Sequence, residues 1–370
     1  MKLAGIYKQF SDQINAAENQ EIHAFSRNLR NNLLAGVTDI IPSYNNIYIE
    51  FNSEIVSKIK LNNWLNQNLE NLQVEKEKKQ ITIPVNYNGQ DLEYISQETN
   101  LTIQQVIQKH SAAVYQVYAM GFTPGFPFMA ELDQAIRLPR RGVPRLSVAA
   151  SSVAIANAQT GIYPFDSPGG WHILGQALVK LYDPNRLEPF LLKAGDMVKF
   201  EPAAPKKLNK VKVLELLEKS KYPFLRVLET GLLDLLVDQG RFLAGHLGLS
   251  RSGAIDARLA NLANSLVANK RNAVILEINI KGPKLELLNK GLIAFASYSL
   301  QLLVNGAIQK SFKTILLKAG DIISFEPLQN AGPSYLAIEG GFASGRFMAS
   351  ASVDLRAKIG RALKVDDVLG

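Results

Sequence analysis

The chain has 370 residues, 47% of them hydrophobic, which is enough to bury the cores of two or three domains. Its 41 basic and 33 acidic residues leave a formal charge of +8, spread along the chain without an aromatic-rich basic element, so we do not expect a nucleic-acid-binding protein. The absence of cysteine excludes disulfides, thiolate metal sites and a cysteine nucleophile.

The first 82 residues combine helical and strand patterns and predict a small α+β domain. Apolar residues recur at helical spacing over 22–34 and 55–72, whereas residues 46–51 alternate as a strand. The N-terminus turns polar at once and predicts no secretory signal, so we expect a cytoplasmic protein. A charged patch at 75–80 separates this domain from a strand at 81–85.

Residues 101–110 predict a short helix with a defined start. Thr102 is the expected N-cap, and Gln105 completes a capping box. His110 falls at the C-terminal end, where the helix dipole favours a protonated imidazole. A capping role and a catalytic role both remain open for it. A strand at 115–118 follows.

Glycine and proline dominate residues 121–175 and predict a compact β-domain of short strands joined by tight turns. The arginines of this segment and its glycine-flanked amides suit a ligand that carries oxyanions. We therefore expect Arg140, Arg145, Gln159 and Trp171 to share one anion-receptive hollow. The alternative for each residue is a solvated loop charge or a packed turn.

A repeated segment indicates two copies of one domain type. Residues 191–202 (LLKAGDMVKFEP) return as 316–327 (LLKAGDIISFEP), and 363–367 form an eroded third copy. Ala-Gly-Asp predicts a turn in which the glycine adopts positive φ and the aspartate bonds the following backbone. Asp196 and Asp321 are therefore expected to be structural.

An exposed connector at 206–222, with a short helix at 213–219, leads to a second domain over 223–370. Asp256 is the expected N-cap of an amphipathic helix whose buried stripe includes Ile255, Leu259 and Leu262. Glu277 lies in an apolar strand and would be a candidate acid or base if buried. The longest apolar stretch, 291–308, contains too many polar residues for a membrane span.

The first 205 residues resemble the B subunit of bacterial ATP-dependent 5-oxoprolinase, a family that includes the Kip-type histidine-kinase inhibitors. The resemblance is carried by His110, Tyr115, GFTPGFP at 121–127, PRR at 139–141, QTGIYP at 159–164 and SPGGWH at 167–172. It implies a cyclophilin-like β-barrel over 83–205 after the 1–82 domain.

Residues 223–370 resemble the first half of the 5-oxoprolinase C subunit, which belongs to a carboxyltransferase-like family. The carrying motifs are DQGR at 238–241, SGAID at 252–256, NSLVAN at 264–269 and KGP at 281–283. The family's Gly-Ser-Arg-Ser-Thr-Asp is reduced to ASASVD at 349–354, and the family continues past residue 370. We therefore expect a fusion with a truncated, incomplete second cyclophilin-like β-domain, and an α+β, mainly β fold for the whole chain.

The resemblance implies an enzyme component that phosphorylates 5-oxoproline with ATP and magnesium for ring opening to glutamate. The implied partner is a homologue of the 5-oxoprolinase A subunit. The implied catalytic residues are His110, Arg140, Arg145, Gln159, Asp256 and Glu277. The implied binding residues are Thr123, Gly125, Phe126, Arg141, Thr160, Tyr163, Ser167, Gly169, Gly170, Trp171, His172, Arg241, Ser252 and Asn264. No metal site is expected.

Two other functions are compatible with the same resemblance. One is a Kip-type regulator that binds a sensor histidine kinase. The other is a carboxyltransferase component, since urea carboxylase has a similar pair of modules. The chain has no biotin-attachment sequence, so that function would require a separate biotin carrier.

Overall fold

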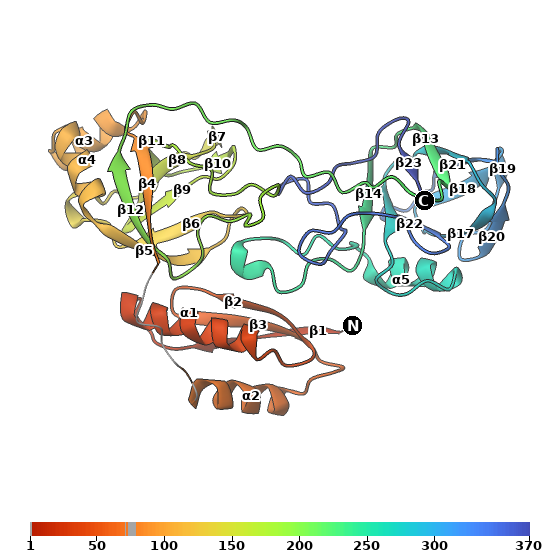
Figure 1. Ribbon diagram of the computed structural model, residues 1–370, viewed down its shortest axis with the longest axis horizontal. Coiled ribbons are helices and arrows are strands. Elements are labelled where there is room, and N and C mark those ends of the chain that lie inside the picture. Colours follow the sequence, from red (N-terminus) through yellow and green to blue (C-terminus); the bar gives the residue numbers. More distant parts are fainter. Residues whose placement is uncertain (1, 71, 73–78) are drawn as a thin grey trace. The chain divides into compact units, whose positions relative to one another are not determined.

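The computed structural model describes residues 2–70, 72 and 79–370. Most of the charged patch expected at 75–80 therefore lies outside the described residues. The chain forms two compact units (Figure 1). The first comprises Met1–Val211 with Leu243–Leu249, and the second comprises Lys212–Phe242 with Ser250–Gly370. Both units are rich in strands, as the mainly β prediction required.

The N-terminal part of the first unit is a three-stranded antiparallel sheet that packs against two helices. The strand order is β1-β3-β2. Side chains from both helices and from the sheet share one buried cluster, which includes Phe25, Ile49 and Leu61. The elements are β1 (Leu3–Gln9), α1 (Ala16–Asn31), β2 (Val37–Pro42), β3 (Asn46–Asn52) and α2 (Lys58–Glu70).

A closed seven-stranded barrel forms the rest of the first unit, with strand order β11-β4-β12-β5-β6-β9-β8. Only the pair β4 and β12 is parallel among its described pairings. The barrel strands are β4 (Gln80–Asn86), β5 (Val114–Met120), β6 (Pro127–Ala130), β8 (Ser152–Ala156), β9 (Gln159–Ile162), β11 (His172–Ala177) and β12 (Met197–Pro202). Outside it lie β7 (Arg145–Val148) paired with β10 (Ser167–Gly169), α3 (Leu92–Thr99), α4 (Ile103–Ala112) and the short 3-10 helix η1 (Gln134–Ile136).

Helix α4 begins as the sequence predicts. The Thr102 side chain accepts a hydrogen bond from the Gln105 amide, and the Gln105 side chain accepts one from the Thr102 amide. The capping box is confirmed, and it fixes where the chain enters the barrel strand β5.

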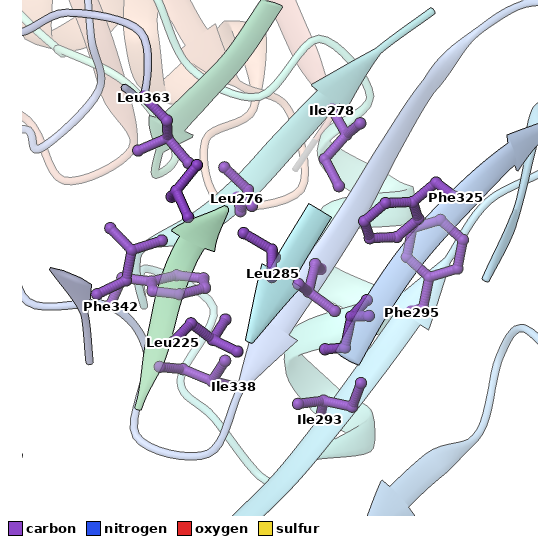
Figure 2. Packing of buried hydrophobic residues seen from close by; sticks show 14 of the residues in the cluster. Leu225, Leu276, Ile278, Leu285, Ile293, Phe295, Phe325, Ile338, Phe342 and Leu363 are labelled. Atoms are coloured by element: carbon purple, nitrogen blue, oxygen red, sulfur yellow. The ribbon is translucent and has the colours of Figure 1, made fainter. Parts of the chain in front are cut away.

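The second unit has two sheets with a hydrophobic core (Figure 2). Its largest cluster joins Leu225 and Leu285 of one sheet to Leu276, Phe295 and Ile338 of the other. The six-stranded sheet is β19 (Ala307–Ile308), β18 (Leu300–Val304), β21 (Ile322–Pro327), β16 (Lys284–Leu287), β13 (Leu225–Glu229) and β23 (Val368–Leu369). The five-stranded sheet is β14 (Leu233–Val237), β15 (Ile275–Asn279), β22 (Pro333–Ile338), β17 (Gly291–Ala296) and β20 (Thr314–Leu317), and helix α5 (Ala257–Leu266) packs on β22 and β17.

Two local predictions in the second unit are wrong. No helix forms at 213–219, where Leu214 and Leu217 instead make isolated bridges to Ile359 and Ser344. Ile255 and Leu262 are 71% and 42% exposed, so they do not belong to the buried stripe of α5. Ile255 precedes the helix, and the buried face runs through Leu259, Ala260, Ala263 and Asn264 instead.

The turn predicted from the repeated segment occurs three times, each time with the same hydrogen bond. The carboxylates of Asp196, Asp321 and Asp367 accept from the backbone amides of Lys193, Lys318 and Lys364 at 2.7 to 2.8 Å. Gly195 and Gly320 adopt φ of 94° and 87°, and Asp366 takes the same place with φ of 69°. The structural role of the two predicted aspartates is confirmed, but each binds the amide three residues before it and not the following backbone.

Within the described part of the chain, no helix is both long and apolar enough to cross a membrane.

Candidate functional site

Two arginines of the Gly/Pro-rich segment bind a buried carboxylate, that of Asp91. Its Oδ1 accepts from Arg145 Nη2 at 2.6 Å and from Arg141 Nη1 at 3.2 Å, and its Oδ2 accepts from the Ile173 amide at 2.6 Å. Asp91 is 4% exposed. These contacts hold the 139–145 loop against β11, and they engage two of the three arginines expected to face an anion.

Further bonds from the same loop fix the SPGGWH segment. The Arg145 Nη1 donates to the Trp171 carbonyl at 3.3 Å, and the Arg141 amide donates to the Gly170 carbonyl at 2.8 Å. His172 donates from Nε2 to the Pro139 carbonyl at 2.9 Å. Its ring stacks on the ring of Tyr94, with the ring centroids 5.2 Å apart. These bonds bring Arg141, Arg145, Trp171 and His172 together, and the anion-receptive hollow expected from the sequence stays a prediction.

Arg140 differs from its two neighbours. It is exposed, and no hydrogen bond or ion pair from its guanidinium is found within the described residues. Its positive charge acts on two tyrosines: burial raises the pKa of Tyr44 and of Tyr163, and Arg140 opposes both shifts. Arg140 is thus the cation of this segment that remains open to a ligand.

An aromatic cluster lies beside that cation. Phe126 packs edge-on against Tyr163 at 5.2 Å and Trp171 at 5.7 Å. Phe128 links Trp171 to Tyr44, at 6.0 and 6.4 Å. Phe126, Tyr163 and Trp171 are at most 5% exposed, so they form a buried hydrophobic cluster beneath these loops.

Tyr44 belongs to the N-terminal domain, so sequence reasoning missed it. It lies in the turn between β2 and β3, and its hydroxyl accepts from Gln159 Nε2 at 2.7 Å. Gln159 is the predicted amide of the site, and its contact with Tyr44 shows that two domains of the first unit build this region together. A turn tyrosine has no sequence signal that separates it from other surface aromatics.

Glycines make room at two places in this region. A Cβ at Gly169 would lie 2.3 Å from the Tyr163 hydroxyl, so a side chain there would displace the tyrosine. Gly125 adopts φ of 79° in the turn after Thr123.

Thr123 and Ser167 are buried, and neither hydroxyl has a hydrogen-bond partner within the described ranges.

His110 is near the C-terminal end of α4, where it is fully buried against barrel strands and not at an open site. Its Nε2 is 2.9 Å from Thr160 Oγ1, its Nδ1 is 2.8 Å from the Tyr87 hydroxyl, and its ring stacks on Phe200 at 4.6 Å. Thr160 donates its own proton to the Ala154 carbonyl, so it accepts from His110. Burial lowers the pKa of His110 to about 3. The expected protonated form is wrong, because burial outweighs the helix dipole.

This histidine predicts a pH dependence of stability. The unfolded chain takes up a proton near pH 6.5, whereas folded His110 does so only near pH 3. The stability from this group is complete above pH 6.5 and is lost as the pH falls toward 3. The free energy of unfolding is measured in urea at pH 7 and at pH 5. Its decrease between these two pH values should be about 2 kcal/mol smaller in His110→Gln than in the wild type. Equal losses in the variant and the wild type would contradict this.

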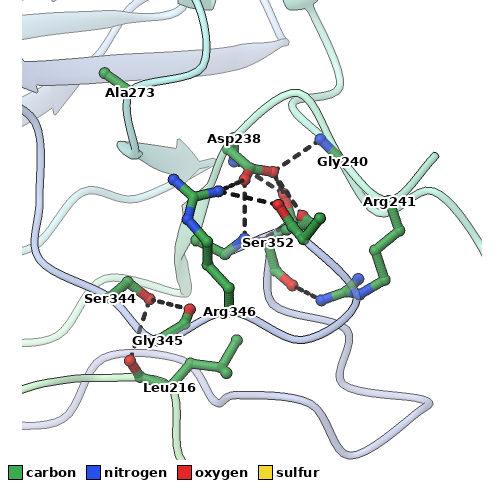
Figure 3. A network of polar contacts seen from close by, with 12 residues as sticks. Leu216, Asp238, Gly240, Arg241, Ala273, Ser344, Gly345, Arg346 and Ser352 are labelled. Carbon is green, nitrogen blue, oxygen red and sulfur yellow. Dashed lines mark hydrogen bonds and ion pairs between the residues drawn. The ribbon is translucent and has the colours of Figure 1, made fainter.

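In the second unit, the carboxylate of Asp238 is the centre of a polar network (Figure 3). Its Oδ1 accepts from Ser350 Oγ, Ser352 Oγ and the Gly240 amide at 2.6 to 2.8 Å. Its Oδ2 accepts from the Ala351 amide and from Arg346, at 2.8 and 3.2 Å. The network joins the DQGR segment to the ASASVD segment.

The C-like residues predicted to bind ligand take part in related contacts. Arg241 is 1% exposed and donates to the Ser352 carbonyl (Figure 3). Ser252 has φ of 53° and donates to Asp354 at 2.8 Å. Asn264 donates to the Ala273 carbonyl at 3.1 Å. All three are held by the protein itself, so their binding roles stay predictions.

Asp256 and Glu277 hold the SGAID loop. Asp256 is the N-cap of α5, because its Oδ1 accepts from the amides of Arg258 and Leu259. Glu277 is 2% exposed and accepts from the Ile255 amide at 2.8 Å and from the Tyr335 hydroxyl at 2.7 Å. The buried carboxylate predicted as an acid or base therefore carries two donors that position the loop.

Both halves of the chain match carboxyltransferase domains. Residues 3–192 match the carboxyltransferase domain, subdomain C and D, and residues 247–370 match the carboxyltransferase domain, subdomain A and B. Over 187 residues the chain is 38% identical to the 5-oxoprolinase B subunit of Haemophilus influenzae, covering 50% of this chain and 86% of that protein. The chain belongs to the carboxyltransferase-domain family of the 5-oxoprolinase B subunit.

The C-like half and the whole fold also have relatives. The chain is 31% identical to the 5-oxoprolinase C subunit of Escherichia coli over 150 residues, covering 39% of this chain and 48% of that protein. The crystal structure of TTHA0988 matches with 42% identity and a TM-score of 0.95, covering 100% of this chain and 74% of that one. The expected fusion of B-like and C-like parts and the expected cyclophilin-like domains agree with these relatives.

Proposed function

We propose that this protein is a component of an ATP-dependent 5-oxoprolinase and supplies the functions of its B and C subunits in one chain. The observation that carries the proposal is the match of one half to the B subunit, with the other half matching the C subunit. These relatives are named as enzyme components and not as kinase regulators, so we take the enzyme role over the Kip-type role.

In the proposed reaction, the lactam oxygen of 5-oxoproline attacks the γ-phosphorus of ATP. A new P–O bond forms as the bond to the ADP oxygen breaks, and magnesium enters with the nucleotide. Water then opens the activated ring, and phosphate and glutamate are released after a second water is consumed. We assign the ring-opening step to a separate A subunit. Such a transfer depends on positioning and on stabilisation of oxyanions.

The region around Arg140 has the groups that this substrate needs. The open guanidinium can bind the substrate carboxylate or a phosphoryl oxygen. Gln159, fixed by Tyr44, presents an amide to the lactam. Arg141, Arg145 and Asp91 act as the frame for these groups.

The remaining predicted residues form two groups, candidates for ligand contact and residues held by internal hydrogen bonds. Thr123 and Ser167 have unpartnered buried hydroxyls within the described ranges, so they stay candidates for ligand contact. His110, Thr160, Asp256 and Glu277 make internal hydrogen bonds, and we propose that they position the barrel and the SGAID loop and do not touch substrate.

The proposal is tested by reconstitution. Purified protein is mixed with a separately purified A subunit, ATP, magnesium and 5-oxoproline, and glutamate is measured. We expect glutamate only when all components are present. The matched control replaces 5-oxoproline by proline, which has the same ring and carboxylate but no lactam oxygen. No glutamate from the complete mixture, or equal ADP formation with proline, would contradict the proposal.

A further inference from the structure

Seven residues of the C-like half belong to the B-like unit. Leu243–Leu249 lie in the first compact unit, whereas Phe242 and Ser250, on either side, belong to the second. We call these seven residues the strap. The strap contains the 3-10 helix η2 (Gly245–Leu247), and the family match to subdomains A and B begins within it, at residue 247.

One end of the strap is bonded to the N-terminal domain. The Leu243 amide donates to the Thr38 carbonyl at 3.0 Å, and the Gly245 amide donates to Asp39 Oδ2 at 3.1 Å. Leu243 packs against the core cluster of that domain. A Cβ at Gly245 would lie 2.5 Å from Ile41 Cδ1, so the strap and β2 are in close contact.

The other end is bonded to the Gly/Pro loop of the barrel. The Gly125 amide donates to the Leu247 carbonyl at 3.2 Å. Gly248 adopts φ of 78°, and a Cβ there would lie 2.9 Å from the Thr123 carbonyl oxygen and 3.2 Å from the Gly121 Cα. Leu247 and Leu249 are 6% and 4% exposed. The strap thus joins β2 to the 121–125 loop.

We propose that β2 and the 121–125 loop form a docking surface for the C-like half, with the strap as its partner, and that this contact holds the loop in place. The surface has the marks of a built interface. Backbone donors and acceptors are paired on both sides, leucines are buried, and a glycine stands where a side chain would meet backbone. Where the B-like and C-like parts are separate chains, this surface would take the matching segment of the C-like chain.

The test uses the whole protein with a cleavable connector. A specific protease site replaces residues in the exposed connector at 206–210, and the cut protein is passed over a size-exclusion column. We expect the two fragments to elute together. Gly248→Ala should weaken their association at least roughly tenfold, because its methyl group meets the Thr123 carbonyl.

Gly306→Ala is the matched control. Gly306 adopts φ of 79°, nearly that of Gly248, but a Cβ there meets nothing within 4 Å. Both variants carry the same left-handed strain, and only one disturbs the strap. A second readout is hydrogen exchange at the Gly125 amide of the uncut protein, which should lose protection in Gly248→Ala alone.

Separation of the wild-type fragments after cleavage would overturn the proposal. So would a Gly248→Ala protein whose fragments stay together as tightly as those of Gly306→Ala, or whose Gly125 amide stays equally protected. None of these results bears on glutamate formation, so the strap and the enzymatic role are tested separately.

Discussion

Replacing Asp238 with alanine is expected to destabilise the second unit by roughly 3 to 5 kcal/mol. The carboxylate is buried and accepts five hydrogen bonds, from two hydroxyls, two backbone amides and Arg346. Alanine would leave these donors without an acceptor in a region that water reaches poorly. The loss should appear as a lower urea midpoint for the second unit.

The control for Asp238 is another aspartate of the same unit. Asp321 accepts hydrogen bonds from the Lys318 amide and from Asn305, but it lies in an open turn. Its replacement by alanine should cost about 1 kcal/mol. Similar losses in the two variants would show that the Asp238 network contributes no more than an ordinary turn.

The second large effect is expected at Arg140 and concerns activity. If the proposed reaction is correct, Arg140→Ala should lower kcat/KM for 5-oxoproline-dependent ADP formation roughly 100- to 1,000-fold. Because the guanidinium makes no hydrogen bond or ion pair to the described residues, Tm should stay the same. Activity is followed by coupled detection of ADP, and Tm by calorimetry.

Arg145→Ala provides the opposite pattern. Arg145 lies 2.6 Å from buried Asp91 and also holds the Trp171 carbonyl. Its loss should reduce stability by about 2 to 3 kcal/mol, since Arg141 alone would then pair with Asp91. If Arg140→Ala lowered Tm as much as Arg145→Ala, or left kcat/KM unchanged, Arg140 would not be the ligand-facing cation.

Features set by local chemistry could be predicted from the sequence. The capping box at Thr102 and Gln105 and the repeated Ala-Gly-Asp turns need only neighbouring residues, and both are present. The N-cap at Asp256 is another such case. Ile255 was placed wrongly because it precedes the helix, where helical spacing no longer says which side faces the core.

Features set by distant partners could not be predicted. Asp91 is some 50 positions from the two arginines that bind it, and no spacing rule connects them. The same holds for Tyr44 with Gln159, and for the strap with Thr38. The protonation of His110 was wrong for a related reason, since its helix position is local but its burial depends on the whole barrel. The ligand-binding roles themselves stay predictions.

The measurement that tests the account most directly is the ratio of products in the reconstituted reaction. With this protein, the separate A subunit, ATP, magnesium and 5-oxoproline together, we predict ADP and glutamate in equal amounts, and ADP formation that depends on 5-oxoproline. ADP formed at the same rate without 5-oxoproline, or no ADP at all, would contradict the proposed role.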